Sequence, residues 1–150
     1  ILAVGAAPLF IGSGGTESLV LRERALSILR NVQLNAMQNT QADCYVAVLQ
    51  NDALGLATTP VCGASSSTLA ASEDSANRMV GFAGKTLTVT DSNGAPVSLP
   101  AEIEFGPLGR PDDTSGLICS GNQACRLTFT ETNGANQSVC INREGYIYGC

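Results

Sequence analysis

Hydrophobic and polar positions divide the chain into three stretches with different patterns. Residues 1–11 carry no charge and no strongly hydrogen-bonding side chain. Residues 16–41 repeat with a helical period, and the rest of the chain consists of short alternating or apolar runs separated by turn residues. These patterns predict an apolar N-terminal segment, one amphipathic helix and a β-rich body, which together make an α+β fold.

The helical stretch begins at Thr16, a suitable N-cap, and its pattern continues to about Gln41. Glu17 follows in the first turn, where the helix dipole favours a negative charge. Apolar residues at three- and four-residue steps form one stripe, which consists of Leu21, Ala25, Ile28, Leu29, Val32 and Ala36. We expect this stripe to pack on the sheet that follows. A coiled-coil dimer is the alternative, but about two or three heptads are short for it.

The body after the helix is predicted to fold into antiparallel strands joined by turns. Residues 44–50 are predicted to form a strand, and its continuous apolar run up to Leu49 suggests burial on both faces. Residues 102–105 alternate and are expected to form a half-exposed strand, and residues 63–77 to form a surface loop with a short helical turn around 67–72. The other predicted elements are strands at 53–58, 79–82, 85–91, 126–130, 138–142 and 145–148, and a loop at 106–116.

The charge balance and the lack of histidine argue against several classes of function. Eight basic and thirteen acidic residues give a net charge of −5, without the clustered positive charge that nucleic acid or an anionic membrane surface needs. No histidine is present, so the chain has no Ser-His-Asp or Cys-His catalytic set. Residues 12–15, Gly-Ser-Gly-Gly, lack the Gly-Lys-Ser/Thr ending of a phosphate-binding loop. We therefore expect no enzyme activity, no cofactor and no nucleic-acid partner.

The six cysteines include no Cys-x-x-Cys pair, and with no histidine they predict a disulfide framework and not a zinc site. Disulfides place the protein in an oxidising compartment such as the periplasm, the ER lumen or the cell exterior. Six cysteines allow 15 pairings, and buried free thiols are the alternative. Proximity in the sequence favours the pairs Cys44–Cys62, Cys119–Cys125 and Cys140–Cys150.

Two pairs of acidic residues are candidate sites, but neither has the partners that its chemistry needs. Asp112 and Asp113 follow a proline on a loop, and a calcium site there is the alternative to a solvated loop. Their spacing falls short of an EF-hand, which favours the solvated loop. Glu102 and Glu104 share one strand face, but no further acid accompanies them for glycosidase chemistry.

Residues near the C-terminal end of the chain suggest two other surfaces. DNA binding needs several arginines on one exposed edge, whereas Arg143 stands alone with Glu144 beside it. Tyr146 and Tyr148 are two positions apart and therefore share a strand face. That face is either exposed, and then suited to adhesion, or part of the core, and the core interpretation is favoured.

The apolar run Ile-Leu-Ala-Val-Gly-Ala-Ala-Pro-Leu-Phe-Ile at residues 1–11 is shorter than the ~20 residues that span a bilayer, and it lacks the basic start of a signal peptide. It resembles the second half of the N-terminal helix of type IV pilins and pseudopilins. Pro8 matches the helix-bending proline of that helix, and Phe10 matches the aromatic residue just after it. The resemblance implies that the prepilin peptidase site, the methylated first residue and the family's glutamate lie upstream of Ile1.

Two further stretches resemble the GspH/FimT-like minor pilins. Residues 24–38 resemble their amphipathic helix, and residues 139–147 resemble their C-terminal strand pair with its V-x-I-x-x-x-G pattern. The resemblance implies a single pilin-like head over residues 16–150, stapled by disulfides. Residues 1–15 would then be the remainder of a truncated apolar helix.

The resemblance also implies a structural role in a type IV pilus, with a type II secretion pseudopilin or a tip adhesin as the alternatives. The apolar helix would lie in the bacterial inner membrane before assembly, with the head in the periplasm, and afterwards among other major and minor pilins in a cell-surface pilus. An extracellular ligand is left open. The residues expected to carry assembly are Leu2, Val4, Pro8 and Phe10.

Overall fold

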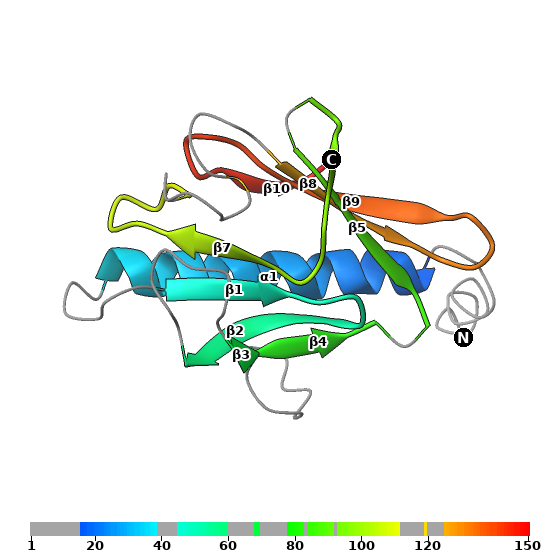
Figure 1. The fold of residues 1–150 in the computed structure, drawn as a ribbon, viewed down its shortest axis with the longest axis horizontal. Coiled ribbons are helices and arrows are strands. Elements are labelled where there is room, and N and C mark those ends of the chain that lie inside the picture. Colours follow the sequence, from blue (N-terminus) through cyan, green and yellow to red (C-terminus); the bar gives the residue numbers. More distant parts are fainter. Residues whose placement is uncertain are drawn as a thin grey trace, which may run out of the picture.

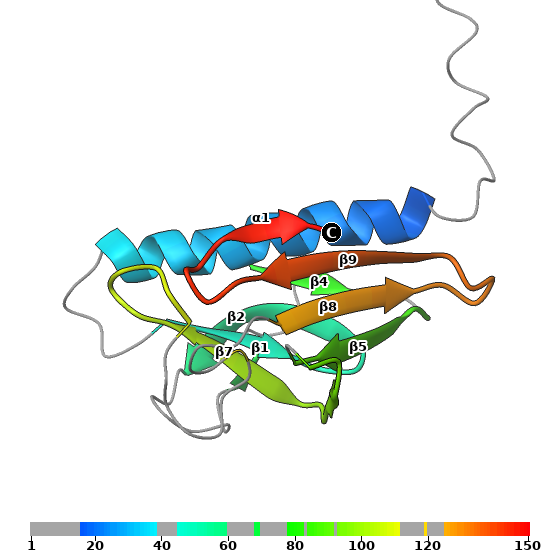
Figure 2. The same cartoon turned by 90° about the horizontal axis from the view of Figure 1, so that it is seen from above.

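The computed structural model describes residues 16–38, 45–59, 68–69, 78–82, 84–91, 93–111, 119 and 125–150. Within these ranges one helix lies along two antiparallel β-sheets, as the two views in Figures 1 and 2 show. The α+β class and the packing of the helix on antiparallel strands, both predicted from the sequence, are confirmed.

Helix α1 (Thr16–Gln38) presents the predicted apolar stripe to the core. All six stripe residues are at most 8% exposed, and Leu26, which the stripe did not include, is buried beside them. The helical pattern was expected to continue to Gln41, and residues 39–41 lie outside the described ranges. The stripe packs within the chain, as expected, so the helix does not need a coiled-coil partner to bury it.

The first sheet has the strand order β3-β2-β1-β7, with β4 also paired to β2. Strands β1 and β2 form a hairpin around Asn51 and Asp52, closed by a hydrogen bond from the Gln50 amide to the Ala53 carbonyl (2.8 Å). The strands are β1 (Tyr45–Leu49), β2 (Ala53–Thr59), β3 (Thr68–Leu69), β4 (Met79–Gly81) and β7 (Ala101–Phe105).

Strand β1 is buried on both faces, as its apolar sequence predicted. Ala47 and Leu49 belong to the main core, whereas Val46 and Val48 form a second small cluster with Ala57. Residues on alternate positions of a strand point to opposite faces, so the two clusters lie on opposite sides of the sheet. The sheet is therefore covered on both sides near β1.

Two predictions for the first sheet are wrong. Strand β7 is buried along its whole length, including Glu102 (2% exposed) and Glu104 (6%), although its alternating sequence predicted a half-exposed strand. The two carboxylates lie opposite Val48 and Val46 of β1, on the face that carries the second cluster. At Thr68–Leu69, where a helical turn was expected, the chain instead forms β3, which pairs with β2.

The second sheet has the order β10-β9-β8-β5-β6. Its inward positions alternate with polar outward positions. The ring of Phe129, on β8, meets the ring of Phe82, which directly follows β4 of the first sheet, edge to face with centroids 5.2 Å apart. The strands are β5 (Thr86–Thr90), β6 (Pro96–Val97), β8 (Cys125–Thr130), β9 (Asn136–Ile141) and β10 (Ile147–Gly149).

Polar contacts tie α1 to the second sheet and to neighbouring turns at points along its length. They complement the apolar stripe because each one satisfies a polar group at the margin of the core. From the N-terminal end, they join Ser18 N to Glu131 Oε1 (2.8 Å), Arg22 Nη1 to Gln137 Oε1 (2.9 Å), Arg30 Nη2 to Ile147 O (2.9 Å), and Gln33 Nε2 to the carbonyl oxygens of Gly109 (2.6 Å) and Gly145.

Candidate interaction surface

The predicted assembly residues fall in a part of the chain that the structure does not describe. Leu2, Val4, Pro8 and Phe10 all lie before Thr16, where the described chain begins. Asp112 and Asp113, the alternative calcium ligands, also lie outside the described ranges. Within those ranges no three acidic or cysteine side chains come together in a group that would hold a metal ion.

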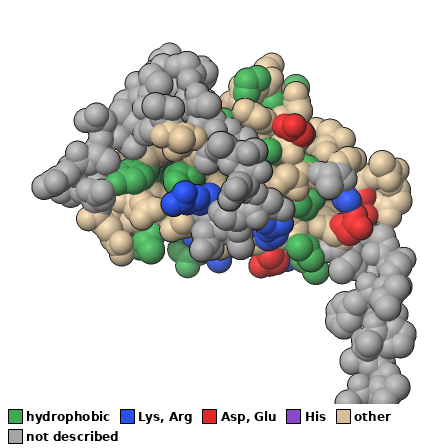
Figure 3. Space-filling model, turned by 90° about the horizontal axis from the view of Figure 1, so that it is seen from below, with side chains coloured by type: hydrophobic (Ala, Val, Ile, Leu, Met, Phe, Trp, Pro, Cys, Tyr) green, Lys and Arg blue, Asp and Glu red, His purple; other side chains and the backbone are tan. Residues whose placement is uncertain are grey.

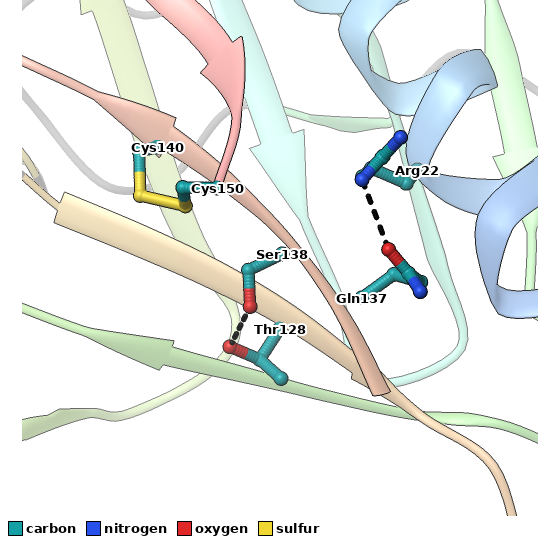
Figure 4. Close-up of a disulfide and its surroundings, with 6 residues drawn as sticks. All are labelled: Arg22, Thr128, Gln137, Ser138, Cys140 and Cys150. Carbon is teal, nitrogen blue, oxygen red and sulfur yellow. Dashed lines mark hydrogen bonds between the residues drawn. A yellow bond between two sulfur atoms is a disulfide. The ribbon is translucent and has the colours of Figure 1, made fainter. Parts of the chain in front are cut away.

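Two of the three favoured disulfides are present. Cys119 is bonded to Cys125 and Cys140 to Cys150, which confirms these two pairings, while Cys44 and Cys62 lie outside the described residues. Each bond closes a short loop and stabilises the fold by about 2–3 kcal/mol in the chain-entropy model. The second bond fastens β10 to β9 at the edge of the second sheet (Figure 4).

The outward face of α1 carries large apolar side chains near both of its ends. Leu19 and Val20 are exposed near the N-terminal end, and Leu34 and Met37 near the C-terminal end. Met37 lies against Gly109, next to Leu108, which is 77% exposed. We call these five residues the outer helix surface.

Charged side chains interrupt the outer helix surface. Between its two apolar ends, the outward positions of α1 are Glu23, Ser27 and Arg30, all exposed. Figure 3 shows such a mixture along its lower rim, where green hydrophobic atoms lie next to blue and red charged atoms. Because the core of a protein interface is depleted of charged residues, the apolar ends of this surface, and not its charged middle, are the parts that a contact with another protein would bury.

The two C-terminal tyrosines are exposed, so the favoured core interpretation is wrong and the alternative of an exposed face is confirmed. Tyr146 is 71% exposed and Tyr148 41%, and their rings meet edge to face with centroids 6.4 Å apart. Ile147 between them is buried, as the alternation of an edge strand requires. Exposed tyrosines are frequent at binding surfaces because they combine apolar area with a polar hydroxyl.

The arginine proposed for the alternative DNA-binding surface lies in a mixed-charge cluster. Glu144 pairs both with Arg143 (3.4 Å) and with Arg110 (3.0 Å), and all three side chains are more than half exposed. The carboxylate offsets part of the positive charge that a phosphate backbone would need.

Comparisons with known proteins leave the family of the chain open. No protein-family model, no curated protein and no solved structure matches it. Among the described residues, no helix combines the length and the apolar character that crossing a bilayer requires. Over the described residues, the structure defines an α+β fold with two disulfides.

Proposed function

We propose that the chain is the head and part of the N-terminal helix of a minor pilin, a structural protein that primes assembly of a type IV pilus or occupies its tip. One observation carries the proposal. Among the described residues a single helix, α1, lies along two antiparallel sheets (Figure 2). In the sequence it begins four residues after an uncharged apolar stretch, residues 1–11. A head on an apolar stalk suits a protein that is first anchored and then assembled.

In this proposal the apolar stretch works as the assembly element. Leu2, Val4, Pro8 and Phe10 would lie in the inner membrane before assembly and among the helices of other pilins afterwards. Burial of each large side chain contributes about 1.5–3 kcal/mol, and Pro8 bends the helix because it removes one hydrogen bond. The head has no enzymatic role and no cofactor, and its partners are other major and minor pilins.

The disulfides and the acidic charge fit the location that the proposal requires. A head that faces the periplasm and then the cell exterior stays in an oxidising environment, where Cys119–Cys125 and Cys140–Cys150 persist. The six cysteines, the acidic head and the Ser/Gly-rich middle resemble those of MshC, a minor pilin of the mannose-sensitive haemagglutinin pilus. We propose this pilus type ahead of a secretion pseudopilin.

Deletion of the gene, followed by shearing and electron microscopy of surface filaments, tests the proposal. Complementation uses the full-length gene and a Phe10→Asp variant, with Ser13→Asp as the control for a charge placed beyond the apolar run. Filaments should be lost on deletion and restored by the wild type and by Ser13→Asp, but not by Phe10→Asp. Normal filaments together with blocked protein export would instead assign the chain to a secretion pseudopilin.

The exposed Tyr146–Tyr148 pair favours a second candidate function, a tip adhesin. The same deletion strain separates the two functions, because an adhesin is not needed for filaments to form. Normal filaments with lost attachment to surfaces would support the adhesin, whereas normal filaments, export and attachment would contradict both candidates.

A further inference from the structure

A cleft of about 460 Å³ opens on the outward face of the second sheet, away from α1. Its walls come from three places that are far apart in the sequence: the turn after β5, the start of β8, and the β9–β10 edge. The lining residues are Thr90, Asp91, Asn93, Gly94, Cys125, Arg126, Cys140 and Tyr148.

The strand register explains why these residues meet. Thr90 lies opposite Arg126, Arg126 opposite Cys140, and Cys140 opposite Tyr148, so the four residues form one row across four adjacent strands. Directly paired residues in a sheet point to the same face. Cys140 lies between Arg126 and Tyr148 in this row. Its disulfide with Cys150 fastens the end of β10, the strand that carries the tyrosine, to β9 (Figure 4).

The turn after β5 is held in shape by its own hydrogen bonds. Oδ1 of Asp91 accepts from the amides of Asn93 (2.9 Å) and Ala95 (2.8 Å), and the Gly94 amide donates to the Asp91 carbonyl (3.0 Å). Apart from Gly94 itself and its two chain neighbours, no atom lies within 4 Å of the position that a Cβ would take at Gly94, so this wall of the cleft stays open. The side chain of Asn93 is therefore presented from a rigid turn.

Arg126 supplies the positive charge of the cleft. Its side chain is exposed, and it has no ion-pair partner among the described residues, unlike Arg22, Arg110 and Arg143, which pair with glutamates. A guanidinium presents a planar fork of donors that matches a carboxylate. On the opposite side of the disulfide, the ring of Tyr148 is braced edge to face by Tyr146.

We propose that this cleft binds a saccharide that carries a carboxylate. The ring of Tyr148 offers an apolar face to the C–H face of a sugar, and Thr90, Asp91 and Asn93 offer hydroxyl, carboxylate and amide groups to its hydroxyls. Arg126 then pairs with the carboxylate of the sugar. An apolar ligand would offer these polar groups no hydrogen bonds. A nucleic acid would meet only one guanidinium in the cleft, on a protein of net charge −5.

The site and its ligand class do not depend on pilus assembly, so their test uses the isolated 150-residue chain in its oxidised form. Titration calorimetry and amide chemical-shift mapping with 3′-sialyllactose and trigalacturonate provide two carboxylated probes, and lactose is the neutral counterpart of the first. We expect at least one carboxylated probe to bind and to shift residues 90–94, 126, 140 and 148. If 3′-sialyllactose binds, lactose, which lacks the carboxylate, should bind at least about 10-fold more weakly.

Variants test which side chains contact the carboxylate and the sugar ring of the ligand. Arg126→Gln should weaken binding about 10- to 100-fold, because a charged hydrogen-bonding partner is lost. Tyr148→Ala should weaken it about fivefold, whereas Tyr148→Phe, which keeps the ring, should retain it. Arg143→Gln removes an exposed arginine outside the cleft and should leave affinity unchanged. Thermal melting of each variant separates lost binding from lost folding.

Three results would overturn the proposal. If neither carboxylated probe binds to the folded chain, the proposed ligand class is wrong. If lactose and 3′-sialyllactose bind with equal affinity, the carboxylate has no role in binding. Unchanged affinity in a folded Arg126→Gln variant would place the binding site elsewhere. None of these results depends on whether the chain assembles into a filament.

Discussion

Glu131 caps helix α1 from the far end of the sequence: its Oε1 accepts a hydrogen bond from the backbone amide of Ser18 at 2.8 Å. The first amides of a helix have no partner within the helix, and the helix dipole favours a carboxylate beside them. Ser18 is fully buried and Glu131 is 8% exposed, so water does not readily replace the bond. The contact fixes the start of the helix to the turn between β8 and β9.

Replacing Glu131 with alanine should lower the free energy of unfolding by about 1–3 kcal/mol, because a buried charged hydrogen bond and a helix cap are lost together. Urea unfolding followed by circular dichroism measures the change. Glu23→Ala is the matched control, since Glu23 pairs with Arg22 on the surface (2.9 Å) and should contribute at most about 1 kcal/mol. Equal losses in the two variants would contradict the capping role.

Gly145→Ala should be strongly destabilising, by about 3 kcal/mol or more. Gly145 has a φ of +90°, and a Cβ built on it would lie 2.1 Å from the carbonyl oxygen of Gly109, so the backbone would have to move. The movement would also disturb the two carbonyl groups that Gln33 binds. Thermal unfolding of the purified variant measures the loss.

Gly134→Ala separates the clash from the conformational cost at Gly145. Gly134 has nearly the same φ, +88°, but nothing lies within 4 Å of its added Cβ. The control should lose only about 1–2 kcal/mol, the cost of a left-handed conformation for an L-residue. Similar losses at both glycines would mean that the Gly145–Gly109 contact relaxes without cost.

Removal of the Cys140–Cys150 disulfide in a double alanine variant should lower the free energy of unfolding by about 2–3 kcal/mol. It should also loosen β10, because this edge strand pairs only with β9 within its sheet. Relative to the wild type, the variant should therefore show a larger increase in the hydrogen-exchange rate at Ile147–Gly149 than at Leu127, which lies in the middle of the sheet. Uniformly faster exchange over the sheet would contradict a local role for the bond.

Val20→Asp should change the free energy of unfolding by no more than about 0.5 kcal/mol from the wild-type value, because Val20 is 51% exposed. If the outer helix surface contacts other subunits, the same variant should reduce the number of filaments. Ser27→Asp is the control for a charge on the outward side of α1, placed between the two apolar ends. Filament counts in the complemented deletion strain and melts of the purified chain provide the two readouts. Equal filament numbers for the two variants would show that Val20 is not part of a contact between subunits.

The helix and most strands could be predicted because their patterns are local. The apolar stripe from Leu21 to Ala36 follows from the helical period alone and does not depend on the rest of the fold. This stripe packs as expected. Glu102 and Glu104 show where local patterns fail. Alternating glutamates indicate a solvated face, but that face lies beside the cluster of Val46 and Val48 and is covered.

The exposed sites depend on long-range register, which the sequence does not display. Tyr146 and Tyr148 were expected to share a face, and they do, but only the order β10-β9-β8-β5-β6 places them at the edge of the sheet and outside the core. The same order aligns Thr90, Arg126 and Tyr148, which come from separate hairpins. No spacing in the chain points to that row.

The Ser18–Glu131 cap also determines how the head would respond to mechanical load. In the proposed pilin, tension on the apolar stalk would reach the head at the first turn of α1 and pass through Glu131 to the junction of β8 and β9. These two strands run alongside the helix and are paired from Cys125–Ile141 to Thr130–Asn136 (Figure 2). Because the pull acts on their shared turn, it would move β8 and β9 together against their outer neighbours β5 and β10. It would then load the β5–β8 pairing, from Thr86–Thr130 to Thr90–Arg126, in shear, so that these hydrogen bonds would not open one at a time, a geometry suited to a subunit that must stay folded under force.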